Sequence, residues 1–348
     1  MEFFVQECPA ALAPLQDYVR AIATPYGLHT LADHIHQILG AFTLYHAIYM
    51  VISPVISSTF FGRHYNVLDK RSTINWDVHV VSFVQSSFIC VIALWAMFAD
   101  SERADYSDHS SLEQAYYRVF GYTPIGAAVT AYAAGYFLWD LMISLWHIKI
   151  MGLGFVAHAV SALTVYSFGF RPFVNFYAPV FILFELSSPF LNIHWFCDKT
   201  GLTGSKIQLI NGFALLGTFF GCRVVWGPIS SYKVFKDIFS VYAQQQAEAR
   251  GEVAVEKMLS GLYPGMQVPL WLAVVYLSSN TVLNCLNYYW FSRMIKTVAS
   301  RFSTPKEKVK KEEEKVWVEG TDVDLATPAK IAGEQVEEVR KRVTRSSK

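Results

Sequence analysis

The feature that most constrains this chain is a series of long apolar segments separated by shorter polar ones. A membrane-spanning helix needs about 20 mainly apolar residues, because each residue adds about 1.5 Å across a hydrocarbon core about 30 Å thick. Seven such segments run over residues 38–60, 79–98, 124–146, 150–168, 173–196, 207–227 and 269–294. Backbone groups in lipid must bond within their own segment. The pattern therefore predicts an all-α, multispanning membrane helix bundle of about seven transmembrane helices.

The distribution of charge supports a membrane domain followed by a solvated tail. Residues 305–348 hold 11 Lys/Arg and 10 Asp/Glu, which leaves charged side chains at only about 12% of the first 304 positions. The chain is 53% hydrophobic, which excludes a disordered protein, and its net charge of +1 gives no basic excess for binding nucleic acid. Its 5 cysteines are too few for a disulfide scaffold.

These patterns predict four regions. Residues 1–34 form an N-terminal tail, and residues 35–70 form the first membrane helix and a loop. Residues 71–298 form the main membrane domain, and residues 299–348 form a charged, disordered tail. Within the main domain we expect the sixth span to stop at Pro228. The segment 233–263 is too polar to span a membrane and is interpreted as a loop that contains a surface helix.

The basic residues favour one orientation. Seven spans place 8 Lys/Arg on the side of the N-terminal tail and 12 on the other side, once the residues that follow the last span are included. Because Lys and Arg near span ends favour the cytoplasm, we predict a cytosolic C-terminal tail. The N-terminus lacks a basic region and a separate apolar core typical of a signal peptide, so the first span is expected to act as the targeting signal and to remain.

Ionisable residues inside spans are costly and indicate candidate functional positions. Asp140, Ser144 and His147 fall at i, i+4 and i+7 and share one helical face. Asp140 could act with a basic partner, or it could be solvated in a crevice. His158 lies near the middle of the fourth span, where it could act as a base or could bond a carbonyl and lock two helices together.

The fifth and sixth spans carry an acid and a base. Glu185 and Asn192 share a face of the fifth span, and Pro189 between them predicts a kink. Arg223 in the sixth span is a candidate counter-charge for Glu185 or for Asp140, and Asn211 begins the same span. Proton-transfer chemistry and an ion-pair clasp that holds the bundle both remain open.

The last span carries a stripe of asparagines at i, i+4 and i+7, namely Asn280, Asn284 and Asn287. Such stripes bond helices together in membranes, and the alternative is a polar wall for a lipid headgroup. We group them with Glu185 and the other polar residues of the spans as lipid- or headgroup-binding candidates. No CxxC, HExxH, GxSxG or phosphate-loop motif is present, so we expect no metal and no cofactor.

Four stretches carry a resemblance to a known family. They are RSTINWDVHVVSFVQS at 71–86, GYFLWDLM at 135–142, FVAHAVSAL at 155–163, and FELSSPFLNIHWF at 184–196 followed by NGFALLGTFFGCR at 211–223. The run from Arg71 to about Lys296 resembles the TLC domain, the Lag1-type multispanning domain of ceramide synthases. It is most similar to the smaller non-synthase TLC-domain transmembrane proteins.

The resemblance implies a bundle of six or more helices around a lipid-sized cavity, usually in the endoplasmic reticulum. In ceramide synthases, two adjacent histidines in this fourth-span region are central to N-acyl transfer from acyl-CoA. Here the matching region reads Ala157, His158, Ala159, so one histidine is missing.

Two functions follow from the resemblance. The first is a protein that binds, senses or handles membrane lipid and influences lipid homeostasis. The second is a lipid N-acyltransferase with acyl-CoA as cosubstrate, in which His158 is the base or acyl acceptor and Asp140 orients it. The partners expected are membrane lipids and a second copy of the chain, and no nucleic acid.

Overall fold

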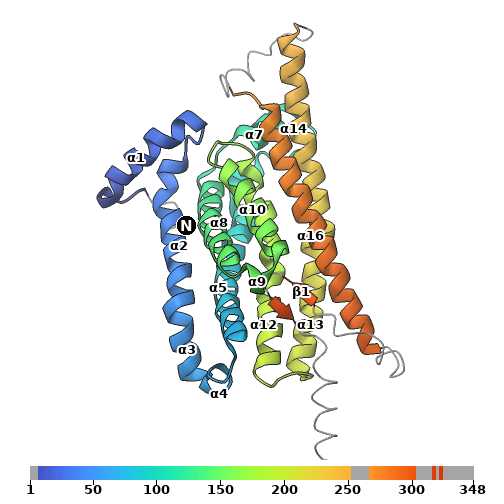
Figure 1. Ribbon diagram of the computed structural model, residues 1–348. Coiled ribbons are helices and arrows are strands. Elements are labelled where there is room, and N and C mark those ends of the chain that lie inside the picture. Colours follow the sequence, from blue (N-terminus) through green and yellow to red (C-terminus); the bar gives the residue numbers. More distant parts are fainter. Residues whose placement is uncertain (1–6, 252–265, 303–315, 319–320, 324–348) are drawn as a thin grey trace, which may run out of the picture.

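The computed structural model describes residues 7–251, 266–302, 316–318 and 321–323, and it is a bundle of helices (Figure 1). All seven predicted apolar segments are helical, which confirms the all-α multispanning architecture. The count of seven spans is not confirmed. Five helical runs are long and apolar enough to cross a membrane: Leu31–Phe60, Lys70–Ala99, Pro124–Trp146, Asn175–Lys199 and Lys206–Ala249.

The region predicted as an N-terminal tail contains helices from Ala10 onward. The helix α1 (Ala13–Ala23) lies between the 3-10 turns η2 (Ala10–Leu12) and η3 (Thr24–Tyr26). The first span then begins at Leu31, earlier than predicted. It consists of α2 (Leu31–Ala47), the π-helical η4 (Ile48–Ile52) and α3 (Ser53–Phe60), and the short helix α4 (Gly62–Tyr65) follows.

The second span also begins earlier than the sequence suggested. The carboxylate of Asp69 accepts a hydrogen bond from the Ser72 amide at 3.1 Å and caps α5 (Lys70–Ala99). The predicted start of this span at residue 79 is therefore wrong, because the helix already begins at Lys70. Two short helices follow outside the spans, α6 (Ser101–Ala104) and α7 (Leu112–Phe120).

The third and fourth predicted segments form an antiparallel pair of helices in the middle of the chain. Thr123 caps α8 (Pro124–Trp146) through the Gly126 amide, and the proline occupies the first turn. The turn contains α9 (Ile148–Met151), and α10 (Leu153–Phe168) packs back along α8. With 16 residues, α10 is apolar but shorter than the five candidate spans.

The fifth span is irregular near Pro189, as its proline predicts. It comprises the 3-10 turn η5 (Asn175–Tyr177), α11 (Ala178–Ile182), the 3-10 segment η6 (Leu183–Ser187) and α12 (Ser188–Lys199). Proline cannot donate to the preceding turn, so the backbone changes geometry just before α12 begins. Glu185 lies within η6, just before this change.

The sixth span does not stop at Pro228, so that prediction is wrong. A continuous run joins α13 (Lys206–Phe219), the π-helical η7 (Phe220–Trp226) and α14 (Gly227–Ala249). The widened π turns precede Pro228 and accommodate its missing donor without ending the helix. The helix within the segment predicted as a loop with a surface helix therefore continues the sixth span up to Ala249, and residues 252–265 lie outside the described part of the chain.

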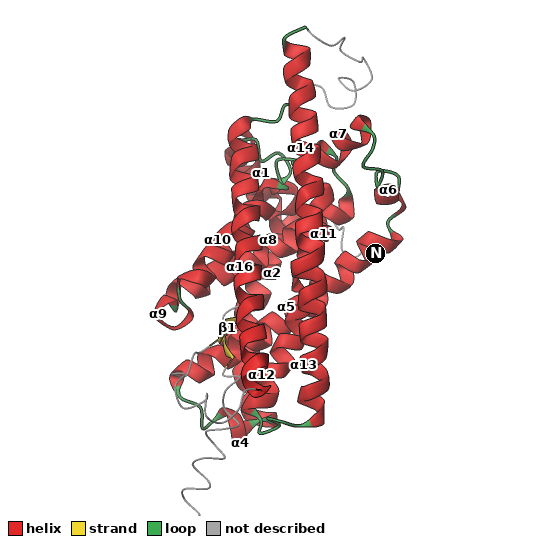
Figure 2. Cartoon of the chain, turned by 90° about the vertical axis from the view of Figure 1, so that its right-hand side faces the viewer, coloured by secondary structure: helices red, strands yellow, loops and turns green. Residues whose placement is uncertain are grey.

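The last long helix, α16 (Leu270–Phe302), runs beside α14 on the side of the bundle opposite α2 and α3 (Figures 1 and 2). In the charged tail, β1 (Val316–Val318) pairs antiparallel with β2 (Thr321–Val323). The largest helix contacts join α8 to α2 and to α10, so α8 forms the centre of the membrane domain.

Candidate functional site

A cavity inside the bundle brings together polar residues from three helical segments. His158 of α10, Glu185 of η6 and Asn280 of α16 line it, together with apolar and aromatic side chains. Its volume is about 30 Å³, which is space for a few water molecules. This is far smaller than the lipid-sized cavity that the resemblance implied. A lipid headgroup can therefore enter this cavity only if the surrounding helices move apart.

The acid at this cavity is held by a serine and an arginine. Glu185 is 6% exposed, and the Ser188 hydroxyl donates to its Oε2 at 2.7 Å. The Arg223 Nη2 lies 3.9 Å from the other carboxylate oxygen. The structure thus pairs Arg223 with Glu185, one of the two counter-charges that the sequence left open.

All three nitrogens of the Arg223 guanidinium donate hydrogen bonds. Arg223 is 1% exposed, and its Nε donates to the Phe184 carbonyl at 2.8 Å and to the Ser187 hydroxyl at 3.1 Å. Its Nη1 donates to Asn287 Oδ1 at 3.1 Å, and its Nη2 donates to Ser188 Oγ at 3.3 Å. Arg223 lies within the π-helical η7, so the widened turns position this side chain between η6 and α16.

The asparagine stripe connects α16 to the sixth span. Asn284 Nδ2 donates to the Ser231 hydroxyl at 2.9 Å and to Asn280 Oδ1 at 3.0 Å, while Asn287 binds Arg223. These contacts match the role of helix-to-helix bonding that the spacing suggested. Asn280 also lines the cavity, so one residue of the stripe serves the candidate site directly.

Of the two residues predicted to be catalytic, His158 lines the cavity and Asp140 does not. The His158 ring lies edge-on to Phe137 and to Trp290, with centroids 6.0 and 5.6 Å away. Asp140 on α8 is half-buried and is not among the residues that line the cavity. The acid that shares a cavity with His158 is Glu185.

Two further candidates lie away from this cavity. Asn192 Oδ1 lies 2.6 Å from His79 Nδ1, and its Nδ2 donates to the Ser82 hydroxyl at 3.1 Å. Asn211 Nδ2 donates to the Phe190 carbonyl at 2.7 Å. Both asparagines thus connect α12 to its neighbours. Neither lines the cavity, although the sequence grouped them with Glu185 as headgroup-binding candidates.

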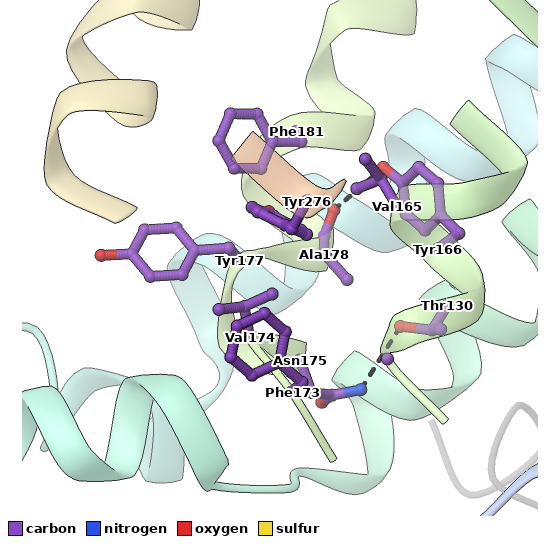
Figure 3. Close-up of a pocket in the computed structure, with 11 residues that line it drawn as sticks. Thr130, Val165, Tyr166, Phe173, Val174, Asn175, Tyr177, Ala178, Phe181 and Tyr276 are labelled. Carbon is purple, nitrogen blue, oxygen red and sulfur yellow. Dashed lines mark hydrogen bonds between the residues drawn. The ribbon is translucent and has the colours of Figure 1, made fainter. Parts of the chain in front are cut away.

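A second, smaller cavity of about 10 Å³ lies beside the first. Figure 3 shows the residues that line it. Asn175 Nδ2 donates to the Thr130 hydroxyl at 3.3 Å along its wall. Three residues line both cavities: Val165, Tyr166 and Phe181. These side chains therefore separate two small spaces that would otherwise be continuous.

Sequence reasoning missed a buried ion pair at one end of the bundle. Arg118 of α7 donates to both carboxylate oxygens of Asp237 of α14, at 2.6 and 2.9 Å, and both side chains are at most 2% exposed. The Tyr177 hydroxyl donates to the same carboxylate at 2.5 Å. Asp237 lies in the segment predicted as a polar loop with a surface helix, so a buried position was not expected for it.

Asp77 was also missed, because the second span was predicted to begin at residue 79. It is 6% exposed on α5 and accepts hydrogen bonds from the Ser53 hydroxyl at 2.6 Å and from the Tyr65 hydroxyl at 3.1 Å. A corrected start of α5 would have identified it as an acid within a span. Within the described residues, no three His, Cys, Asp or Glu side chains gather closely enough to hold a metal ion.

Comparison with known proteins gives consistent matches. The family model of the TLC domain matches residues 75–296. An uncharacterized TLC domain-containing protein of Schizosaccharomyces pombe is 37% identical, over 84% of this chain and 88% of its own length. Topoisomerase I damage affected protein 4 of Saccharomyces cerevisiae is 27% identical, over 81% of this chain and 90% of its own.

A human relative is more distant. TLC domain-containing protein 4 of Homo sapiens is 25% identical, over 67% of this chain and 77% of its own length. No solved structure matches the chain.

Proposed function

Because this chain belongs to the TLC domain family, we propose that it binds a membrane lipid at the cavity of His158, Glu185 and Asn280 and thereby influences membrane lipid homeostasis. The observation that carries the proposal is the convergence of these three polar side chains inside a helix bundle that carries apolar side chains on its outer surface. Polar groups in lipid surroundings are expensive to keep, and they mark the positions where a membrane protein recognises something polar.

The proposed ligand is a lipid whose polar end reaches the cavity while its chain lies among the apolar helices. The small volume supports a mode of binding in which α10 or α16 moves aside, since both helices contribute to the wall. The membrane lipid is the partner, and binding requires no cofactor. We further propose that this multi-pass membrane protein resides in the endoplasmic reticulum with a cytosolic C-terminal tail.

A filling variant tests lipid binding at this cavity. Ala162 of α10 lines the cavity and is 2% exposed, whereas Ala157 lies on the exposed side of the same helix. Purified protein in nanodiscs is irradiated with a diazirine-bearing phospholipid, and the crosslinked peptides are mapped. Ala162→Phe should reduce crosslinking within residues 153–168 and 270–302 several-fold, and the matched control Ala157→Phe should not.

Leu283→Phe fills the same cavity from α16 and keeps the test independent of one variant's folding. Equal crosslinking in the wild-type protein and in both filling variants would contradict lipid binding at this position. Lipidomics on a deletion strain complements the experiment, because it does not presuppose which lipid is bound.

The second candidate function is acyl transfer, and it is favoured by one observation: His158 shares its cavity with a carboxylate. In this reaction the nitrogen of a long-chain amine would attack the thioester carbon of acyl-CoA. The C–N bond forms, the C–S bond breaks, the amine proton passes to His158, and the CoA thiol leaves with a proton. Asp140 orients the imidazole in this proposal, and Glu185 is an alternative for that role.

The two functions separate in a direct assay. Purified protein with acyl-CoA and a panel of long-chain amines and lipid alcohols should form an amide or ester if the second function holds, and His158→Ala should abolish the product. Absence of product across the panel, together with crosslinking at the cavity, leaves lipid binding as the function.

A further inference from the structure

The helix α1 presents a row of apolar side chains that no part of the described chain covers. Tyr18, Ile22 and Tyr26 follow one another at intervals of four residues and are 65%, 49% and 72% exposed. Pro14 extends the row by one turn and is also exposed. Residues four apart lie on the same face of a helix, so these side chains form one stripe along α1 and η3.

The polar residues of α1 attach it to the beginning of the first span. Arg20 Nη2 donates to Asp33 Oδ1 at 2.8 Å, and Gln16 Nε2 donates to the same oxygen at 3.2 Å. Asp33 lies in the first turn of α2, the helix against which α1 packs. The polar contacts of α1 thus point to α2, and its apolar stripe is left on the outside.

Contacts at the end of η3 locate α1 at the edge of the membrane. Arg171, in the loop between α10 and η5, donates from Nη1 to the Tyr26 carbonyl at 2.8 Å. Its guanidinium carbon also lies 5.3 Å from the centre of the Trp271 ring, at the start of α16. Arg, Trp and Tyr gather where spans end, because each has an apolar body and a polar tip.

The turn after η3 fixes the course of the chain at this point. Gly27 has φ of +78°, a left-handed conformation that favours glycine, and a Cβ at Gly27 would lie 2.7 Å from the Arg171 side chain. The chain therefore reverses within a few residues. As a result α1 lies obliquely along the outer side of α2 near its beginning, as Figure 1 shows.

We propose that α1 is an interfacial helix whose stripe of Pro14, Tyr18, Ile22 and Tyr26 is buried at the boundary between headgroups and acyl chains of the same bilayer that the bundle spans. The stripe continues the apolar outer surface of the first span, where Leu44 is 50% exposed and Val51 is 59% exposed. The lipid-facing surface of α2 and α3 thereby extends onto α1, which is attached at the beginning of α2.

Two features indicate that lipid, and not a protein partner, covers the apolar stripe of α1. A stable protein interface needs about 800 Å² per partner, far more than one row of four side chains on an 11-residue helix offers. In addition α1 carries one acid, Asp17, and one base, Arg20, so it has no net charge to recruit a charged partner. Its attachment to the bilayer should therefore depend on apolar burial and not on anionic lipid.

The test measures which probe reaches α1 in a bilayer. Nitroxide labels are placed on full-length protein at Tyr18→Cys or Ile22→Cys, in a background of Cys8→Ser and Cys285→Ser, in phosphatidylcholine nanodiscs. Power-saturation EPR compares collisions with oxygen, which partitions into lipid, and with a nickel chelate, which stays in water. Asp17→Cys, at a side chain that is 75% exposed on the polar side of the helix, is the matched control. Val51→Cys is the reference within the span.

The expected oxygen-to-nickel ratio at residues 18 and 22 is several-fold above that of residue 17 and below that of residue 51. A ratio equal to that of residue 17 would place α1 in water and overturn the proposal. Suppression of both probes would indicate a protein partner or a second copy, and would also overturn it. Replacing about a third of the lipid with phosphatidylserine should leave the ratio unchanged, and a rise would contradict attachment through apolar burial.

Discussion

Arg223 shows how one residue organises the polar interior of this membrane domain. Its five donors face the Phe184 carbonyl, two serines, Asn287 and Glu185, so η6, η7 and α16 meet at a single guanidinium. Taking a charge out of water is costly, and a buried pair offsets that cost only when both members remain.

Removing Arg223 alone should therefore destabilise the fold strongly. Arg223→Met leaves the Glu185 carboxylate buried without its counter-charge, and we expect a loss of about 3 kcal/mol in the free energy of unfolding. Denaturant unfolding in detergent micelles measures it. The double variant Arg223→Met/Glu185→Gln removes both charges and should recover much of the loss. A double variant as unstable as the sum of the single ones would show that the two residues do not interact.

His109 belongs to the polar cluster at the end of α7, outside the spans. Its Nδ1 lies 3.7 Å from Asp237 Oδ2, beside Arg118, and its side chain is 25% exposed. Burial lowers the pKa of His109 below its ordinary value, and the charge of Arg118 lowers it further, while Asp237 opposes both effects.

This shift predicts a dependence of stability on pH. The unfolded chain protonates His109 at a higher pH than the folded chain does, so the contribution of this residue is lost as the pH falls below its ordinary pKa. Acidification from about pH 7.5 to about pH 5.5 should lower the Tm of the wild-type protein more than that of His109→Gln. Parallel Tm curves for the two proteins would contradict a role for His109.

At the scale of the helices, Gly135 determines how closely the first span approaches the centre of the bundle. A Cβ at this position would lie 2.5 Å from the Ile38 carbonyl oxygen and 2.8 Å from the Ala41 Cβ. Both neighbours belong to α2, and real Cβ atoms do not approach backbone so closely. Close approach at small residues is a common way for helices to pack in membranes.

Gly135→Ala should force α2 away from α8 and destabilise the protein by about 1–3 kcal/mol, the usual cost of overpacking. Gly217 in α13 is the matched control, because a Cβ there meets nothing within 4 Å. Gly217→Ala should be neutral or slightly stabilising, since alanine favours a helix over glycine. Thermal unfolding of the two variants in the same detergent provides the comparison, and equal Tm values would contradict tight packing at Gly135.

The elements also show which features a sequence can predict. Apolar length identifies each helical run, since every predicted span is helical, and Pro189 correctly predicts an irregular fifth span. Polarity does not locate helix ends, because α5 and α14 continue through polar residues such as Asp77 and Asp237. Those residues are tolerated through tertiary partners, Tyr65 and Arg118, which a single sequence does not reveal.

The candidate site was also predicted only in part from the sequence. Sequence spacing identified the asparagine stripe of α16, and charge offered Glu185 as one of two partners for Arg223. The sequence alone does not show which acid lies in the cavity with His158, because that depends on how η6 turns toward α10. The separation of Asn192 and Asn211 from the cavity likewise depends on the rotation of whole helices, which hydropathy does not determine.

For the molecule as a whole, the pair α8 and α10 contributes an even number of crossings. Gly169 follows α10, and a Cβ there would lie 2.6 Å from Thr130 near the beginning of α8. The next carbonyl, that of Phe170, accepts a hydrogen bond from the Thr30 amide at 3.1 Å, just before α2. The pair therefore returns to the end of the bundle where the first span begins, whether or not the short α10 crosses completely. The side of the membrane on which each remaining loop lies therefore depends on whether the other long helices cross.

This topology predicts on which side each loop is labelled. Single cysteines are placed at Ser107, Leu202 or Ser347 in a background of Cys8→Ser and Cys285→Ser. Ser347 lies outside the described residues. In sealed microsomes a membrane-impermeant maleimide should label residues 202 and 347 at once and residue 107 only after detergent, because α16, the seventh span expected from the sequence, should make the last crossing. Labelling of residues 107 and 347 together would show that α16 does not cross. Labelling of residue 107 alone would invert the orientation that the basic residues predict.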